Sequence, residues 1–147
     1  MNIKITNLHK DAILPEYQTP GAAGADLHAC IDKPITLQPM ERQRIPTGVA
    51  IAIPKGFELQ IRARSGMGLK HGITMVNGVG TIDSDFRGEL GVLLINLGQE
   101  PFTVEPGMRI AQMVVARHET VEWREVDYLD ETSRGDAGYG STGQSAN

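Results

Sequence analysis

The chain has 147 residues, a single cysteine, a net charge of −4 and 40% hydrophobic residues. This length suits one domain, the lone Cys30 excludes an intrachain disulfide or a cysteine-based metal cluster, and the negative charge argues against a nucleic-acid partner. No run of about 18 apolar residues occurs and residues 1–5 lack a signal-peptide core, so we expect a cytoplasmic protein with no membrane partner.

Short runs rich in Ile and Val recur between glycines and prolines, a pattern typical of β-strands. Within Phe57–Arg62, apolar and polar residues alternate, which favours a half-buried strand. One helix is predicted, at Gly66–His71, because Gly72 can end it. The fold class predicted is therefore all-β, a sandwich or jelly roll. The strands predicted are Gly48–Ile53, Phe57–Ala63, Ile73–Val76, Glu89–Asn96, Phe102–Val104 and Arg109–Ala116.

The composition changes abruptly at Ser133, where glycine, serine and threonine become frequent. We therefore predict a β domain over residues 1–132 and a separate C-terminal arm over residues 133–147. A disordered tail is one interpretation of the arm. The other is a mobile segment that closes over a ligand, since it carries a cation, an aromatic ring, hydroxyls and free N–H groups. The composition alone favours neither strongly enough to exclude the other.

Two segments in the first half of the chain combine small residues with charged ones. Residues 21–27 allow close backbone approach and carry the carboxylate of Asp26, although an aspartate in such a segment, taken alone, is more often a turn former. Residues 63–67 end a strand with Arg64 and Ser65 where the short helix begins. Free N–H groups at a helix start suit phosphate, although an N-cap serine is an alternative interpretation.

Two more segments follow in the second half. Residues 77–88 predict a hairpin, because Asn77-Gly78 favours a tight turn, and then supply two acidic residues and the aromatic Phe86. Residues 107–112 place Arg109 and Gln112 on either side of an apolar pair, which alone would suit the start of an ordinary strand. The glycine-rich C-terminal arm is the fifth segment.

Together, these segments resemble the trimeric dUTPase family, in order and in approximate spacing, from about Asn2 to Gly143. The matching residues are Ala23–Leu27, Arg64–Gly66, Gly80–Asp83, Gly107–Gln112 and Gly140–Gly143. The resemblance implies a distorted jelly roll with a flexible arm, assembled as a homotrimer whose subunits share their active sites. It implies hydrolysis of dUTP to dUMP and pyrophosphate with Mg²⁺, which limits uracil incorporation into DNA and supplies dUMP for dTMP synthesis.

The resemblance also assigns catalytic roles. Asp83 would hold the water that attacks the α-phosphorus and accept its proton, which suits an ionised carboxylate. Ser65 and Gln112, with Arg64, would hold the phosphates and stabilise charge on the leaving pyrophosphate. Magnesium would be held mainly by the phosphates, and Asp26 would reach it through water.

Further assignments concern the base, the sugar and the arm. The Asn77–Asp83 segment would pair with uracil, and the ring of Phe86 would exclude a 2′-hydroxyl. The family usually has tyrosine where Phe86 stands and phenylalanine where Tyr139 stands, so the chain keeps both rings but changes their hydroxyls. Arg134 would meet the outer phosphate. The full set of substrate contacts implied is Arg64, Ser65, Gly66, Asn77, Gly80, Thr81, Ile82, Asp83, Phe86, Gln112, Arg134, Tyr139, Gly140, Ser141 and Thr142.

Two other functions, and a second role for Arg109, are alternatives to these assignments. A dCTP deaminase shares the fold but needs a glutamate three residues before an asparagine, and here that position is Leu93, which cannot shuttle protons. A non-catalytic nucleotide-binding protein has no evident need of Asp83 as a base. Arg109 fits either an ion pair near the site or a purely structural role.

Overall fold

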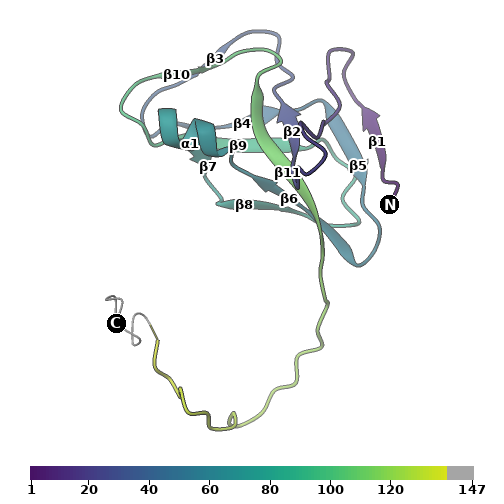
Figure 1. The fold of residues 1–147 in the computed structure, drawn as a ribbon, viewed down its shortest axis with the longest axis vertical. Coiled ribbons are helices and arrows are strands. Elements are labelled where there is room, and N and C mark those ends of the chain that lie inside the picture. The colour runs from purple at the N-terminus through teal and green to yellow at the C-terminus, as the bar shows by residue number, and fades with distance from the viewer. Residues whose placement is uncertain (139–147) are drawn as a thin grey trace.

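The computed structural model describes residues 1–138, whose regular structure is almost entirely β (Figure 1). The prediction of an all-β chain is therefore confirmed. One short helix, α1 (Ser65–His71), is present in the described residues. The strands are β1 (Lys4–Asn7), β2 (Ala25–His28), β3 (Ile35–Leu37), β4 (Arg42–Pro46), β5 (Val49–Ala52), β6 (Phe57–Arg62), β7 (Ile73–Met75), β8 (Val79–Ile82), β9 (Gly91–Asn96), β10 (Phe102–Val104) and β11 (Arg109–Arg117).

Every strand pairing is antiparallel, and two sheets dominate. The larger sheet has the order β2-β11-β6-β8, and a three-stranded sheet has the order β4-β9-β7. Two strand pairs, β1-β5 and β10-β3, complete the arrangement. Non-consecutive strands are neighbours throughout, so residues far apart in sequence meet in the larger sheet.

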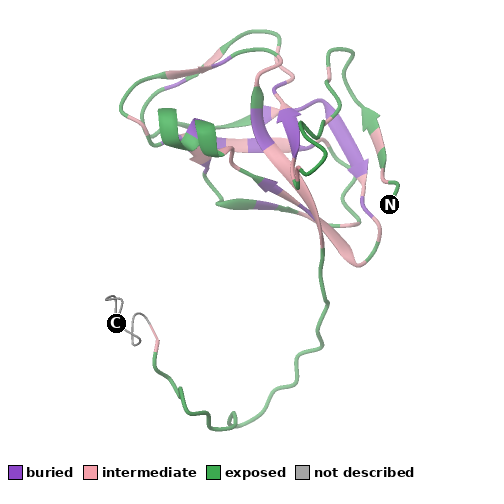
Figure 2. Cartoon of the chain, in the orientation of Figure 1, coloured by how far each residue is buried: buried purple, intermediate pink, exposed green. Residues whose placement is uncertain are grey.

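The core lies between these sheets. In β9, buried and half-buried residues alternate, and the buried Val92 and Leu94 join one cluster with Leu27, Leu59 and Ile61 of the larger sheet. In Figure 2 the buried positions lie on strands of the packed body, with β2 and β5 buried along most of their length. This alternation is what a sheet with one face against a core requires. The core therefore fixes the larger sheet, which carries Asp26, Gln112 and residues 80–82 of the candidate site.

All six predicted strands are present, with ends shifted by a residue or two. The missed strands are β1, β2, β3, β4 and β8. In β4 only Ile45 is fully buried, and the strand forms through its pairing with β9, from Arg42 opposite Ile95 to Pro46 opposite Gly91. A strand defined by a distant partner gives a weak local signal.

The predicted helix is confirmed, and it begins one residue earlier than expected, at Ser65. Gly72 ends it in the left-handed conformation, at φ 69°. Arg64, not Ser65, occupies the N-cap position and makes no side-chain capping bond. The N-cap interpretation of Ser65 is therefore wrong, and its exposed side chain is available for another role.

After β11 the chain leaves the packed body and crosses open space, as Figures 1 and 2 show. Residues 118–138 form no helix or strand, and Trp123, Tyr128 and Leu129 are more than four-fifths exposed. The packed part therefore ends at Arg117, before the change of composition at Ser133. Across the described residues, the structure has no helix with the length and apolar character needed to cross a membrane.

Candidate functional site

Asp26 lies at the centre of the densest group of charges in the predicted site. Its side chain, only 10% exposed on β2, receives Arg64 Nε at 3.1 Å on one oxygen and Arg109 Nη1 at 3.2 Å on the other. Arg64 Nη1 also donates to the Arg109 carbonyl at 3.1 Å. One carboxylate thus holds two guanidinium groups, which leaves the group positively charged and suited to an anion. The predicted ion pair of Arg109 near the site is confirmed.

Gln112 joins this group through the register of the larger sheet. It lies opposite Asp26 on one side and opposite Arg62 on the other. Its side-chain Nε2 donates to the Ala63 carbonyl at 3.1 Å. A β-carbon on Gly24 would overlap the Gln112 side-chain oxygen, so the small residue in the first segment is needed for close approach. We call Asp26, Arg64, Arg109 and Gln112 the Asp26 group.

Ser65 and Gly66 follow Arg64 directly and begin α1. Both are exposed, and the Ser65 hydroxyl makes no hydrogen bond to another described residue. The bonds of Arg64 within residues 1–138 use Nε and Nη1, which leaves Nη2 as a donor. The fold therefore brings Arg64, Ser65 and Gln112 to one end of β6, where Arg64 Nη2 and the Ser65 hydroxyl have no hydrogen-bond partner among residues 1–138.

The predicted uracil segment is placed elsewhere and is not a hairpin. Gly78, at φ 70°, donates to the Met75 carbonyl at 3.1 Å and closes a tight turn. However, β7 before this turn pairs with β9, and β8 after it pairs with β6. The turn therefore carries the chain from one sheet to the other, because each strand buries its apolar face against a different neighbour.

Within the segment, Asn77 and Thr81 are exposed, Gly80 is buried and Ile82 is half-buried against the core. The chain then enters what we call the Asp83 loop, residues 83–88. Asp83 and Phe86 are both exposed, and the Phe86 N–H donates to the Asp83 carbonyl at 3.2 Å. The carboxylate and the ring thus stand on the same turn.

Asp26, on β2, and the Asp83 loop, which follows β8, lie at opposite edges of the larger sheet. Adjacent strands are roughly 4.8 Å apart, so the three steps from β2 to β8 span roughly 14 Å. Val79 is in register with Arg62, and through Gln112 with Asp26. Asp83 lies four residues beyond Val79, which adds a separation of roughly 13 Å along the strand direction. No hydrogen bond or ion pair within residues 1–138 joins the two regions. One chain does not bring together all the predicted site residues.

Arg134 is exposed and makes only local bonds among the described residues. Its Nε donates to the Ala137 carbonyl at 2.9 Å. The other arm residues predicted to contact substrate, Tyr139, Gly140, Ser141 and Thr142, lie outside the described residues. The contact of Arg134 with a phosphate stays a prediction.

Two residues beside Asp26 were missed by sequence reasoning. The Glu16 carbonyl accepts from the Asp26 N–H at 2.9 Å, a backbone contact with no sequence signal. His28 lies two residues after Asp26, the spacing that puts two side chains on one face of a strand. Its Nδ1 is buried and has no hydrogen-bond partner among the described residues. Burial lowers the pKa of His28, with Asp26 acting in the opposite direction.

Asp26 is the single carboxylate of its group, and both its oxygens already accept from arginine. Each carboxylate oxygen has a further lone pair, so it can also accept from a metal-bound water. This donor set does not form a cage for direct coordination. It fits a magnesium ion that arrives on a phosphate chain and keeps most of its waters.

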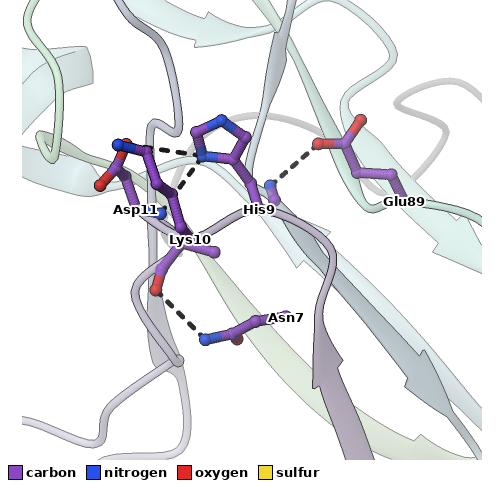
Figure 3. Close-up of polar contacts among 7 residues, drawn as sticks. Asn7, His9, Lys10, Asp11 and Glu89 are labelled. Atoms are coloured by element: carbon purple, nitrogen blue, oxygen red, sulfur yellow. Dashed lines mark hydrogen bonds and ion pairs between the residues drawn. The ribbon is translucent and has the colours of Figure 1, made fainter.

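A separate cluster of potential metal ligands comprises His9, Asp11 and Asp32, whose ligand atoms lie within 4.8 Å of one another. Figure 3 shows His9 Nδ1 already accepting from the Asp11 N–H, at 3.2 Å, with Lys10 Nζ 3.8 Å from the Asp11 carboxylate. All three potential ligands are exposed, and none lies in the five segments. The cluster gives no reason to move the predicted magnesium from Asp26.

Leu93, where a deaminase would need glutamate, is half-buried on β9. The buried Asn96 that follows is occupied structurally, because its Nδ2 donates to the carbonyls of Leu37 and Glu100 at 2.9 and 2.8 Å. A β fold that carries a positive, partly buried group able to bind an anion and, on a separate loop, an exposed carboxylate has the features of a phosphate-binding hydrolase.

Comparison with known proteins makes this class specific. The family model for dUTPase matches residues 10–143. The chain is 58% identical to the deoxyuridine 5′-triphosphate nucleotidohydrolase of Treponema denticola, covering 94% of this chain and 96% of the relative. For the Rickettsia felis enzyme of the same name, identity is 55% with 96% of each chain covered. The chain belongs to the dUTPase family.

The fold agrees with a solved member of that family. The G164S mutant dUTPase of Staphylococcus bacteriophage 80alpha, solved with dUpNHpp, has a TM-score of 0.88 and 26% identity to this chain. The likeness covers 97% of this chain and 99% of the phage chain. The predicted dUTPase-type jelly roll is confirmed.

Proposed function

We propose that this protein hydrolyses dUTP to dUMP and pyrophosphate by attack of water on the α-phosphorus. Its membership of the dUTPase family carries this proposal, because relatives more than half identical over nearly the whole chain bear that activity in their names. The positive Asp26 group supports it independently, since it offers a triphosphate preformed cationic donors.

Asp83 is the proposed general base. An exposed carboxylate on a short loop can hold a water and take its proton as the bond to phosphorus forms. The leaving oxygen of pyrophosphate gains charge at the same time, and Arg64, Ser65 and Gln112 are the proposed donors to it and to the other phosphate oxygens. Gly66, which has no side chain, allows the phosphates to approach the start of α1.

Substrate selection is proposed for the neighbouring segment. The main chain of Asn77, Gly80, Thr81 and Ile82 would pair with uracil, and buried Gly80 fixes that backbone against Ile61. A rigid wall refuses an added methyl group, because overpacking typically costs about 1–3 kcal/mol. The ring of Phe86 would lie against the deoxyribose and leave no room for a 2′-hydroxyl.

Magnesium would be held chiefly by the three phosphates and by water, with Asp26 accepting from one of those waters. When bound, the ion neutralises charge on the phosphate chain and orders it for in-line attack. The side chains of Arg64 and Arg109 would keep Asp26 oriented for this contact.

We propose a homotrimer in which one subunit supplies the Asp26 group and another the Asp83 loop. The separation of these regions across and along the larger sheet supports this arrangement. Large apolar side chains exposed along residues 118–138, notably Trp123 and Leu129, are also typical of a surface that another copy covers. The arm of the third subunit would close over the substrate, through Arg134, Tyr139, Gly140, Ser141 and Thr142. A cytoplasmic location and the absence of a nucleic-acid partner stay predictions.

Pyrophosphate release from dUTP, with dCTP and dTTP as matched substrates, tests the proposed activity. We expect release from dUTP in the presence of Mg²⁺, strongly reduced release from dTTP and dCTP, and a loss of activity on chelation. Ammonia released from dCTP would instead support a deaminase. Tight dUTP binding with no product would support a non-catalytic nucleotide-binding protein.

A further inference from the structure

The ring of Phe86 rests against Gly88, two residues further along the Asp83 loop. A β-carbon built on Gly88 would lie 2.7 Å from Phe86 Cζ and 3.1 Å from Cε2. Real β-carbons essentially never come so close to another atom, so any side chain at position 88 must displace the ring. The Gly88 Hα at the place of this β-carbon therefore points at Phe86 Cζ, the end of the ring farthest from its backbone.

The backbone gives no separate reason for glycine at this position. Gly88 is not among the glycines with positive φ, so an alanine can adopt its conformation without strain. The three atoms nearest to a β-carbon built at Gly88 all belong to the Phe86 ring. What an added methyl group disturbs is therefore the ring and not the course of the chain.

The side chain of Arg87 holds the backbone that carries the ring. Arg87 Nη1 donates to the carbonyls of Ser84 and Phe86, at 2.7 and 2.8 Å. Together with the bond from the Phe86 N–H to the Asp83 carbonyl, these contacts fix the turn between the proposed base and the ring. With its backbone fixed, Phe86 can move only by rotation of its side chain. The contact of the ring with Gly88 limits that rotation.

We propose that Gly88 is a specificity-determining position, whose missing side chain lets the Phe86 ring settle where it excludes a ribose 2′-hydroxyl. This inference rests on the proposed dUTP hydrolysis and deepens it. Phe86 is 41% exposed, so an added methyl group at position 88 can push the ring toward solvent at little cost to the fold. The change is expected in sugar selection, with folding largely preserved.

The test compares kcat/KM for dUTP with kcat/KM for UTP in Gly88→Ala. We expect the ratio to fall by at least about tenfold, the usual range for one methyl group in a fitted pocket. Gly68→Ala is the matched control, because its β-carbon would lie an ordinary 3.8 Å from its nearest contact, the Ile73 carbonyl. In a Phe86→Ala background, Gly88→Ala should change the ratio no further, since no ring remains to be displaced.

Proton NMR of the free protein tests the contact without substrate, through a nuclear Overhauser effect between Phe86 Hζ and Gly88 Hα that Phe86→Ala abolishes. Absence of this effect, an unchanged ratio in Gly88→Ala, or an equal fall in the Phe86→Ala background would each overturn the proposal. A parent protein that releases no pyrophosphate from dUTP would overturn the proposed function as well. An active parent with an unchanged ratio overturns the Gly88 role alone.

Discussion

The Asp26 group and the Asp83 loop are held in different ways. In the first, a largely buried carboxylate binds two arginines across three elements of the fold, and sheet register sets Gln112 beside it. In the second, an exposed turn is held by its own backbone, by Arg87 and by contact of one ring with Gly88. The Asp26 group is therefore part of the folded framework, whereas the Asp83 loop lies at the surface.

This difference separates stability from chemistry. Removing a buried ion-pair partner costs stability because the remaining charges lose their compensation. Removing an exposed carboxylate without a partner costs the fold little. Changes in the Asp26 group should therefore reduce stability and activity together, whereas changes in the Asp83 loop should reduce activity alone.

Asp83→Asn should give the largest loss of activity. Asparagine keeps the shape but cannot accept the proton, so turnover should fall by about 10²–10⁴-fold. Thermal midpoint and dUTP affinity, measured by calorimetry, should stay near those of the parent. Asp85→Asn, on the same loop, is the matched control and should stay active. Near-parental turnover of Asp83→Asn would remove this residue from the role of base.

Ending the chain after Ser133 should leave the β domain folded, because the packed part ends at Arg117. Turnover should fall on the order of 10²-fold if the arm positions the phosphates. Thermal unfolding and pyrophosphate release from the shortened chain measure the two effects. Full activity in the folded, shortened chain would restore the interpretation of the arm as a disordered tail.

Asp26→Asn should lower stability as well as activity. Arg64 and Arg109 would lose their shared carboxylate, at a cost of about 1–2 kcal/mol, since hydrogen bonds to charged groups are stronger than neutral ones and both arginines are partly exposed. Urea denaturation measures the loss. A variant as stable as the parent would contradict the description of this group as part of the folded framework.

Gly24→Ala should have a smaller effect on stability, about 1 kcal/mol, because the Gln112 side chain can move aside. The hydrogen bond from Gln112 Nε2 to the Ala63 carbonyl should weaken, and activity should fall as a result. Gly21→Ala is the matched control, since a β-carbon there meets nothing within 4 Å. Equal behaviour of the two variants would show that the close approach at Gly24 does not matter.

The two regions also differ in how far sequence predicted them. The identity of Asp26, Arg64 and Gln112 came from the five segments, but their contacts depend on antiparallel register between β2, β6 and β11, which local patterns do not encode. Asn77-Gly78 correctly predicted a turn. It was wrongly interpreted as a hairpin, because the partners of β7 and β8 are set by burial in two different sheets.

The roles of Gly24 and Gly88 were also beyond sequence reasoning. Small residues suggested close approach, but which side chain approaches is a property of the fold. The strands β1, β3 and β4 were missed for a similar reason, since short or polar segments become strands through pairing with distant partners. Long apolar strands such as β9 and β11 carry their own signal and were predicted.

In the proposed trimer, the Asp26 group and the Asp83 loop of one active site come from different subunits. Refolding Asp83→Asn together with Gln112→Ala in equal amounts tests it directly, once each variant alone is shown to be inactive. If mixing is random, an unmutated Asp83 loop meets an unmutated Asp26 group in roughly one quarter of the sites. Activity should then return to about that fraction of the parent's. Mixed trimers, confirmed by native mass spectrometry, that show no activity would contradict the shared site.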